Sequence, residues 1–320
     1  MDFLKPTCLI CGGTFSHFQQ KIVMYSLYSC ADCGLEFLYP QPQEEVLANI
    51  YGQNYYNSWG MEKSEKIAQH LKWRTFQMRL DLVAQRLSSG ARILDLGCAT
   101  GYFLDVVKKR GFAPYGVELS EFGANLCKSK FGEGHIFCGE LHNAVFSDNL
   151  DGKFEAIFMS DFLEHVRNPA AIIEQASQLL SPRGKVVITT PTTEAISKRL
   201  FGKSWPQYKI EHLFYFNRTN LVRLLKQYGF EPLLIIPARK AINLSYLREQ
   251  FMSYPHSILT PIFRLLGVIL PEWIKELLFT VTIGEMVVVA ENTNPHHWRG
   301  PGSVTLPGGG LETEPPRCCF

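Results

Sequence analysis

The stretch that decides the fold is Ile93-Leu94-Asp95-Leu96-Gly97-Cys98-Ala99-Thr100-Gly101. It reads as a short apolar strand carrying one acid, followed by a tight turn between two glycines and a helix that starts at Tyr102. Glycine lets the backbone approach a ligand closely, and a helix N-terminus favours a nearby anionic group. The spacing Asp-x-Gly-x-x-x-Gly differs from the GxGxxG dinucleotide fingerprint. The stretch therefore predicts a ligand site at the carboxyl end of a buried strand.

Strands and helices alternate on both sides of this stretch. A helix is expected to begin at Pro169, with Asn168 as its N-cap, and another is expected over 219–228. Alternation of this kind indicates strand–helix–strand units and an α/β fold with a mostly parallel sheet. The expected strands are short apolar runs at 92–96, 114–118, 155–159, 185–189, 233–236 and 286–290.

Composition and charge exclude several classes of protein. The chain has 320 residues, of which 46% are hydrophobic, so it can bury a large core and is not intrinsically disordered. Its 32 basic residues barely exceed its 30 acidic ones, so generic binding to a nucleic-acid backbone is not expected. The sequence shows neither a signal-peptide pattern nor an apolar run long enough to span a membrane. We therefore expect a soluble cytoplasmic protein whose cysteines stay reduced.

Two Cys-x-x-Cys turns lie near the N-terminus. Two residues between paired cysteines let both thiolates face one point, and a glycine follows each pair. Two such turns produce the closed four-thiolate tetrahedron of a structural zinc site, whereas a redox pair would be expected beside a strand–helix–strand unit. The predicted Zn²⁺ ligands are Cys8, Cys11, Cys30 and Cys33.

Changes of composition divide the chain into four parts. Residues 1–40 hold the predicted zinc site without regular periodicity, 41–89 read as a helical linker that contributes to the substrate pocket, and 90–292 form the main domain. The Pro- and Gly-rich tail, 293–320, is expected to be disordered. Within the domain, 243–282 is expected to be an amphipathic helical insertion. Its apolar face either packs on the domain as a lid or makes peripheral contact with a membrane or lipid-linked substrate. This face comprises Ile258, Ile262, Leu265, Leu266 and Ile269.

The next predicted strand ends at Glu118, 17 residues after Gly101, where an acid can accept hydrogen bonds from both hydroxyls of a ribose. With this acid, the 93–101 stretch resembles motif I and the following acidic position of the class I S-adenosylmethionine-dependent methyltransferases. The resemblance extends through 154–166 and 180–191 and covers 90–292. It implies a Rossmann-like, doubly wound α/β fold with a mostly parallel seven-stranded sheet, and S-adenosylmethionine as the cofactor.

The same resemblance implies roles for individual residues. Asp95 would orient the methionine end of the cofactor, Glu118 would bind the ribose hydroxyls, and Asp161 would lie beside the sulfonium. Gly97 and Gly101 would form the floor of the site, and Glu140 would lie where the family contacts adenine.

The acceptor side needs a base if a hydroxyl or a carbon acid is methylated. Two of the nine histidines directly follow a glutamate, in Glu164-His165 and Glu211-His212. An adjacent carboxylate can raise the basicity of an imidazole, and the second pair follows the fifth strand, at the edge where such sheets bind ligands. We therefore predict that His212, supported by Glu211, is the catalytic base. His165 would shape the same pocket or have a structural role.

The cysteine turns, the segment 211–216 and a tyrosine cluster together resemble the deoxysugar C-methyltransferases and enzymes of bacterial surface-polysaccharide synthesis. This resemblance implies a small sugar-like acceptor, nucleotide-linked or lipid-linked, and the shorter relatives imply methylation of oxygen. Three alternatives stay open: a quinone or lipid intermediate as acceptor, an RNA or protein acceptor docked on the zinc segment, and a non-catalytic scaffold. The tyrosines are Tyr51, Tyr55 and Tyr56.

Overall fold

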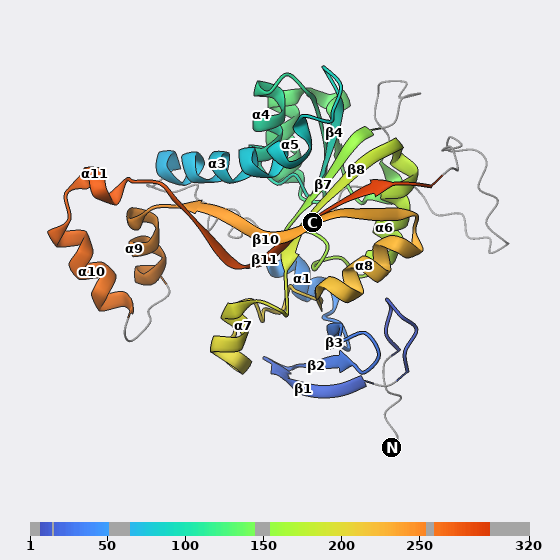
Figure 1. Cartoon of the computed structure of the whole chain (residues 1–320), viewed down its shortest axis with the longest axis horizontal. Helices are drawn as coiled ribbons and strands as arrows, with labels where there is room; N and C mark the ends of the chain where they lie inside the picture. The colour runs from blue at the N-terminus through green and yellow to red at the C-terminus, as the bar shows by residue number, and fades with distance from the viewer. Residues whose placement is uncertain (1–6, 15, 51–64, 145–153, 254–258, 295–320) are drawn as a thin grey trace.

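The structure is a computed structural model that describes residues 7–14, 16–50, 65–144, 154–253 and 259–294. Over these residues the chain forms a large mixed sheet with helices on both faces and a small antiparallel sheet beside it (Figure 1). The predictions for the tail beyond residue 294 and for the tyrosine cluster lie outside the described residues, the tyrosines being Tyr51, Tyr55 and Tyr56.

The large sheet has seven strands in the order β10-β11-β8-β7-β4-β5-β6, which confirms the predicted doubly wound architecture. Neighbouring pairs among β8, β7, β4, β5 and β6 are parallel, whereas β11 runs antiparallel to both β8 and β10. The strand with the decisive stretch, β4, lies inside the sheet between β5 and β7. The bounds are β4 Arg92–Leu96, β5 Ala113–Glu118, β6 Ile136–Cys138, β7 Phe154–Ser160, β8 Leu180–Pro191, β10 Phe230–Ile242 and β11 Phe279–Asn292.

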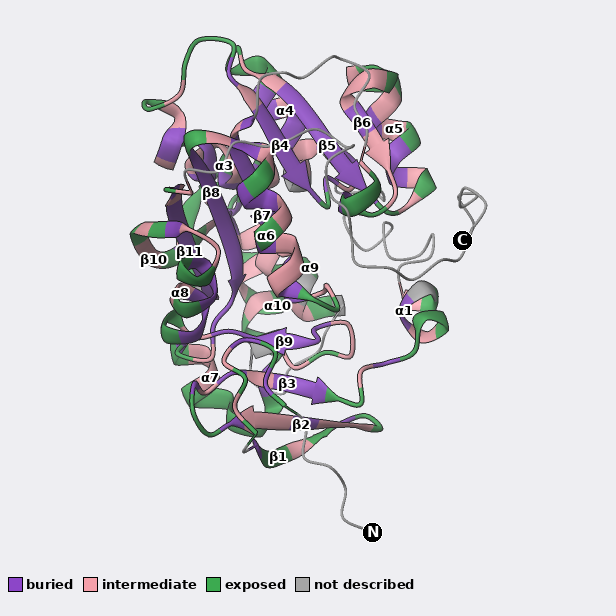
Figure 2. Ribbon diagram, turned by 90° about the vertical axis from the view of Figure 1, so that its right-hand side faces the viewer, coloured by how far each residue is buried: buried purple, intermediate pink, exposed green. Residues whose placement is uncertain are grey.

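Helices cover both faces of this sheet, so its central strands are buried on both sides (Figure 2). Side chains alternate along each strand: Ile93 packs with Phe103 of one helical layer, and Leu94 belongs to the opposite cluster with Leu221. The cap predicted at Asn168 is confirmed, because its side chain accepts a hydrogen bond from the backbone N–H of Ala171 at 3.2 Å. The helices are α3 Glu65–Ala84, α4 Tyr102–Lys109, α5 Glu121–Phe131, α6 Pro169–Leu179 and α8 Arg218–Gln227, with shorter ones at α1 Glu44–Ile50 and α7 Ile196–Phe201.

The N-terminal segment has more regular structure than its sequence suggested. It forms three antiparallel strands, β1 (Ser16–Ile22), β2 (Tyr25–Cys30) and β3 (Glu36–Tyr39). A fourth strand, β9 (Phe214–Tyr215), joins the free edge of β3 from the main domain of the chain. The lack of hydrophobic periodicity was misleading here, because backbone hydrogen bonds hold the ladder whatever the side-chain pattern.

The insertion also differs from its predicted limits. Its helices are α9 (Leu244–Ser253), α10 (Leu259–Ile269) and α11 (Glu272–Lys275), and 279–282 belong to β11 rather than to the insertion. The paired strands β10 and β11 extend beyond the sheet as an arm that carries these helices (Figure 1). Part of their apolar surface is exposed, since Leu265 is 59% and Trp273 68% exposed. Ile258 of the predicted apolar face lies outside the described residues. No helix among the described residues is long and apolar enough to cross a bilayer.

Candidate active site

The turn after β4 depends on two glycines. Gly97 and Gly101 have φ values of 75° and 83°, a backbone region that favours glycine. A Cβ atom at Gly97 would lie 2.8 Å from a ring carbon of Phe162, and one at Gly101 would lie 2.8 Å from a ring carbon of Phe131. Neither position has room for a side chain, so the turn keeps its backbone open toward the end of the sheet.

Glu118, the last residue of β5, fastens this turn to the next helix. One carboxylate oxygen accepts a hydrogen bond from the backbone N–H of Ala99 at 2.7 Å, and the other accepts from that of Ser120 at 2.8 Å. The side chain is buried and its orientation is set by these two donors. Each carboxylate oxygen has a second lone-pair site, so hydroxyl donors such as those of a ribose fit this group.

Asp95 supplies the strongest reason to expect a positively charged ligand group here. The residue is only 4% exposed, and burial together with the neighbouring Glu118 raises the pKa of its carboxyl well above the usual range. The Arg79 guanidinium opposes this shift only in part. A cation beside Asp95 would relieve the cost of ionising it in this buried position. The ammonium and sulfonium of S-adenosylmethionine are such cations, so the residues present fit this cofactor.

The two remaining predicted cofactor residues have different surroundings. Glu140 follows β6 on the surface and pairs with His142, their O–N separation being 3.2 Å. The backbone N–H of Gly139 donates to the carbonyl of Glu118 at 2.9 Å, which keeps this connection beside the end of β5. Asp161 directly follows β7 with a strained φ of 51°. Both residues therefore lie at the edge of the sheet where the glycine turn is found.

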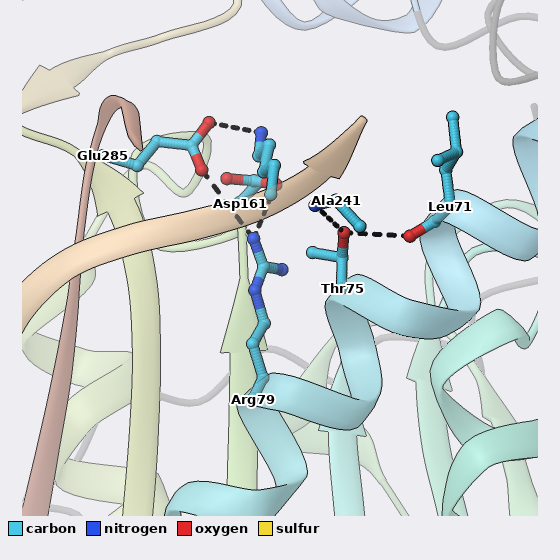
Figure 3. A network of polar contacts seen from close by, with 7 residues as sticks. Leu71, Thr75, Arg79, Asp161, Ala241 and Glu285 are labelled. Carbon is cyan, nitrogen blue, oxygen red and sulfur yellow. Dashed lines mark hydrogen bonds and ion pairs between the residues drawn. The ribbon is translucent and has the colours of Figure 1, made fainter. Parts of the chain in front are cut away.

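Asp161 belongs to a buried charge network that the sequence did not reveal (Figure 3). Its carboxylate lies 4.0 Å from Arg79 of α3 and 3.9 Å from Lys240 of β10, and both cations also pair with Glu285 of β11. Burial opposes ionisation of Asp161, but Lys240 and then Arg79 keep its pKa below the usual range. The signal that could have found the network is a charge close to the end of each of two predicted apolar strands, Lys240 after 233–236 and Glu285 before 286–290.

The fold brings His165 and His212, the two histidines predicted for the acceptor side, together although 46 residues lie between them in the sequence. The rings of His165 and His212 meet edge to face, with centroids 4.7 Å apart. Glu164, not Glu211, is the carboxylate beside them, because ligand-type atoms of Glu164, His165 and His212 all lie within 4.8 Å of one another. Glu164 is fully buried, and burial followed by Asp161 raises the pKa of its carboxyl well above the usual range.

The two histidines are held by backbone groups. His165 shares a hydrogen bond through Nδ1 with the carbonyl of Glu211 at 3.0 Å, and His212 hydrogen-bonds the backbone of Gln207. The Nδ1 atom of His212 has no hydrogen-bond partner among the described residues. Burial lowers the pKa of His165 to about 4 and that of His212 well below 6.5, so both rings are neutral at pH 7.

Glu211 does not have the contact that the sequence suggested for it. Its carboxylate lies 4.0 Å from the Lys209 ammonium, while its backbone carbonyl is the group that contacts His165. Residues 210 and 211 form a turn, and the N–H of His212 donates to the carbonyl of Lys209 at 3.3 Å, so adjacency in sequence does not bring the Glu211 carboxylate to the His212 ring. The carboxylate that lies near the imidazole in space is that of Glu164, within 4.8 Å of His212.

The four N-terminal cysteines converge as predicted. The Sγ atoms of Cys8 and Cys33 are 3.7 Å apart, those of Cys11 and Cys30 are 3.4 Å apart, and all four lie within 4.8 Å of one another. Tetrahedral Zn–S bonds of about 2.3 Å require S–S separations of about 3.8 Å. The cluster fits a Zn²⁺ ion. The N–H of Gly12 and of Gly34 closes each turn by donating to the carbonyl of the first cysteine at 2.9 Å.

Comparison with known proteins agrees with the fold. Residues 64–235, which are 172 of the 320 residues, match the family described as Methyltransferase domain, and the chain belongs to this family. Two solved structures share the fold at low sequence identity. A chain of the complex of the Haloferax volcanii Trm112 methyltransferase activator has a TM-score of 0.51 and 13% identity, covering 75% of this chain and 98% of that one. A Galdieria sulphuraria protein named for sarcosine dimethylglycine methyltransferase has a TM-score of 0.50 and 17% identity, covering 75% of this chain and 97% of that one.

Similar curated proteins include two ubiquinone biosynthesis O-methyltransferases. The protein of Dechloromonas aromatica (strain RCB) is 29% identical over 116 residues, and that of Xylella fastidiosa (strain M23) is 32% identical over 117 residues. Each match covers 35% of this chain and 50% or 47% of the relative. The chain thus spans about half the length of the curated relatives that it matches.

Proposed function

We propose that this chain is an S-adenosylmethionine-dependent methyltransferase that methylates a hydroxyl oxygen of a small acceptor. The observation that supports this most strongly is a juxtaposition at the ends of two adjacent parallel strands. Leu96 of β4 is in register with Met159 of β7. The glycine turn with its two buried acids therefore begins next to the loop that carries Asp161, Glu164 and His165. A cofactor side and an acceptor side share one edge of the sheet.

The cofactor side would work by charge and hydrogen bonding. S-adenosylmethionine, when bound, supplies a methyl group activated by its sulfonium. Asp95 would pair with the ammonium of the methionine end, Glu118 would accept from the ribose hydroxyls, and Glu140 would lie near the adenine. Asp161 stays ionised through Arg79 and Lys240 and would favour the positive charge of the cofactor. These residues bind and orient, which is the main requirement of an in-line displacement.

The acceptor side would take up a proton. His212 is neutral and its Nδ1 has no partner among the described residues, so a hydroxyl placed there can donate to it. A positive charge formed at His212 would offset the burial that raises the pKa of the neighbouring Glu164 carboxyl and would favour its ionised form. His165, tied to the Glu211 backbone, would fix the ring from the side. Proton removal by a positioned base typically contributes about 10²–10⁴ in rate.

The acceptor we favour is a sugar-like or similar small hydroxylated molecule, because buried polar groups and aromatic rings surround His212, including Glu164, His165 and Tyr215. A quinone or lipid intermediate is the second candidate. It is supported by the ubiquinone biosynthesis function for which the curated relatives are named and by the exposed apolar side chains of α10 and α11. These side chains include Ile262, Leu265, Val268, Ile269 and Trp273.

Transfer of labelled methyl groups tests the proposal. Purified protein is incubated with methyl-labelled S-adenosylmethionine and, separately, with a nucleotide-linked deoxysugar and with a hydroxylated quinone precursor. Labelled product from the sugar, with the label on oxygen, supports the first acceptor, and label only in the quinone product supports the second. Absence of S-adenosylmethionine binding by calorimetry, or binding of NAD instead, would refute the methyltransferase assignment itself.

A further inference from the structure

The four-cysteine segment is built into the acceptor side rather than attached as a separate module. Its last strand, β3, pairs with β9, with Glu36 opposite Tyr215 and Phe37 opposite Phe214. The N–H of Leu38 donates to the carbonyl of Leu213 at 3.0 Å, and the N–H of Leu213 donates to the carbonyl of Glu164 at 2.8 Å. Leu213 directly follows His212, so backbone bonds connect the segment to both partners of the proton-accepting pair.

Glu36 adds a side-chain connection from the same strand. Its carboxylate accepts a hydrogen bond from the Tyr208 hydroxyl at 2.8 Å and pairs with the ammonium of Lys198. The carboxylate is largely buried, with 13% side-chain exposure, so solvent weakens this pair less than one on the surface. Tyr208 in turn packs edge to face on Trp205 and Tyr215. Glu36 therefore fastens the 205–215 segment, which contains His212, from outside.

The cysteine turns are anchored to the helix that follows this segment. The carbonyl of Cys33 accepts hydrogen bonds from the side-chain amides of Asn217 at 3.2 Å and Asn220 at 3.4 Å, the two residues that form the capping box of α8. The carbonyl of Ile10 accepts from the side chain of Gln227 at 3.1 Å, near the other end of α8. Both turns that hold the cysteines are thus clamped to one helix.

We propose that the metal-bound four-cysteine segment acts as a brace for 205–216 and that Glu36 is a positioning residue for His212. The brace sets the distance between His212 and Glu164, and it does so from a part of the chain about 170 residues away in sequence. A displacement of the base by about 1 Å can cost on the order of 10² in rate, so a small loosening of the brace slows methyl transfer without touching the cofactor side. The proposal about turnover rests on the function proposed above, whereas the brace itself does not.

Hydrogen exchange of the full-length protein tests the brace without any acceptor. Zn²⁺-loaded protein is compared with protein stripped by a chelator and with the Cys30→Ser variant. Exchange in 205–216 should rise at least about tenfold on metal loss, together with that of 8–39, while 92–118 stays protected. Protection of 205–216 that does not change when 8–39 loosens overturns the proposal. Uniform loss of protection, which would mean global unfolding of the stripped protein, also overturns it.

Glu36→Gln tests the positioning role in protein that keeps its metal. Turnover should fall by about 10- to 100-fold while the KM for S-adenosylmethionine is unchanged. The acid limb of the kcat/KM profile should move to higher pH, because a loosened segment exposes His212 to water. The matched control is Glu133→Gln, which removes a carboxylate paired with Lys128 on the surface, where Glu133 is 82% exposed. If the two variants change turnover equally, or if Glu36→Gln lowers stability without shifting the pH profile, Glu36 has only a structural role and the positioning proposal is overturned. A failed methyl-transfer assay with normal exchange results would count against the proposed function and not against the brace.

Discussion

Replacing Glu118 by alanine is the most direct test of how the cofactor side works. The change removes the carboxylate of a residue that is only 7% exposed, and this carboxylate accepts two backbone hydrogen bonds at 2.7 and 2.8 Å. Hydrogen bonds to a charged group contribute about 1.5–3 kcal/mol each, and loss of the ribose contact alone should cost about 1–3 kcal/mol. At about 1.4 kcal/mol per tenfold change, the Kd for S-adenosylmethionine should rise by about 5- to 140-fold.

Two effects on the free protein accompany this loss and have opposite signs. The N–H groups of Ala99 and Ser120 lose their acceptor, which destabilises the glycine turn and the start of α5. The neighbouring Asp95 loses a like charge, which lowers the pKa of its carboxyl and offsets part of that cost. Glu118→Gln separates these contributions, because an amide oxygen still accepts one of the two hydrogen bonds, and its Kd should lie between those of the wild type and the alanine variant.

Isothermal titration calorimetry with S-adenosylmethionine and its demethylated product measures the effect below the melting temperature of each variant. Glu133→Ala serves as the control for loss of an exposed carboxylate and should leave the Kd unchanged. A Kd within twofold of the wild type for both Glu118 variants would refute the placement of the ribose at this residue. An equal loss of affinity in the Glu133→Ala control would mean that the change in net charge weakens binding, and not the loss of a ribose contact.

Further outcomes follow from the acceptor side, the metal and the charge network. His212→Ala should lower turnover by about 10²–10⁴ at unchanged cofactor affinity; normal turnover with a lower melting temperature would mean that His212 only packs. Purified protein should contain one zinc per chain, and the Cys30→Ser variant should lack it. A second zinc ion that is present in the wild type and lost in His212→Ala would make His212 a metal ligand and contradict its proton-accepting role. The free energy of unfolding should fall as pH drops from about 6.5 to about 4, by up to about 1.4 kcal/mol per pH unit, because His165 takes up its proton at higher pH in the unfolded state than in the folded state. The His165→Gln variant should show a smaller slope in the same titration. Arg79→Met should cost about 3 kcal/mol or more in a denaturant titration, since Asp161 loses a buried partner.

Much of the geometry of the proposed cofactor side was predictable because its signals are local. The acid and glycines of 93–101 lie within nine residues, and the positive φ values of Gly97 and Gly101 explain why only that residue type suits the turn. The paired Cys-x-x-Cys turns are equally local, since two intervening residues already direct both thiolates to one point. The mostly parallel core of the sheet followed from the alternation of strand and helix.

The geometry of the proposed acceptor side was predictable only in part. The sequence pointed to His165 and His212, but it assigned the supporting carboxylate to Glu211 by adjacency, and the structure places Glu164 there instead. It also treated residues 1–40 as an isolated knuckle, although β3 completes its sheet with β9. Neither contact is visible in the hydrophobic periodicity of the sequence. The first joins buried side chains that are distant in sequence, and the β3–β9 pairing is made by backbone groups that every residue has.

The sequence by itself determined the α/β core, the glycine turn with Asp95 and Glu118, and the four-cysteine cluster, because each depends on residues close together in the chain. The tertiary structure alone decided which carboxylate faces His212, that β3 braces the segment before α8, and that Arg79, Asp161, Lys240 and Glu285 neutralise one another. These contacts join elements that are tens to hundreds of residues apart, and their geometry follows from how the helices and strands pack rather than from any local pattern.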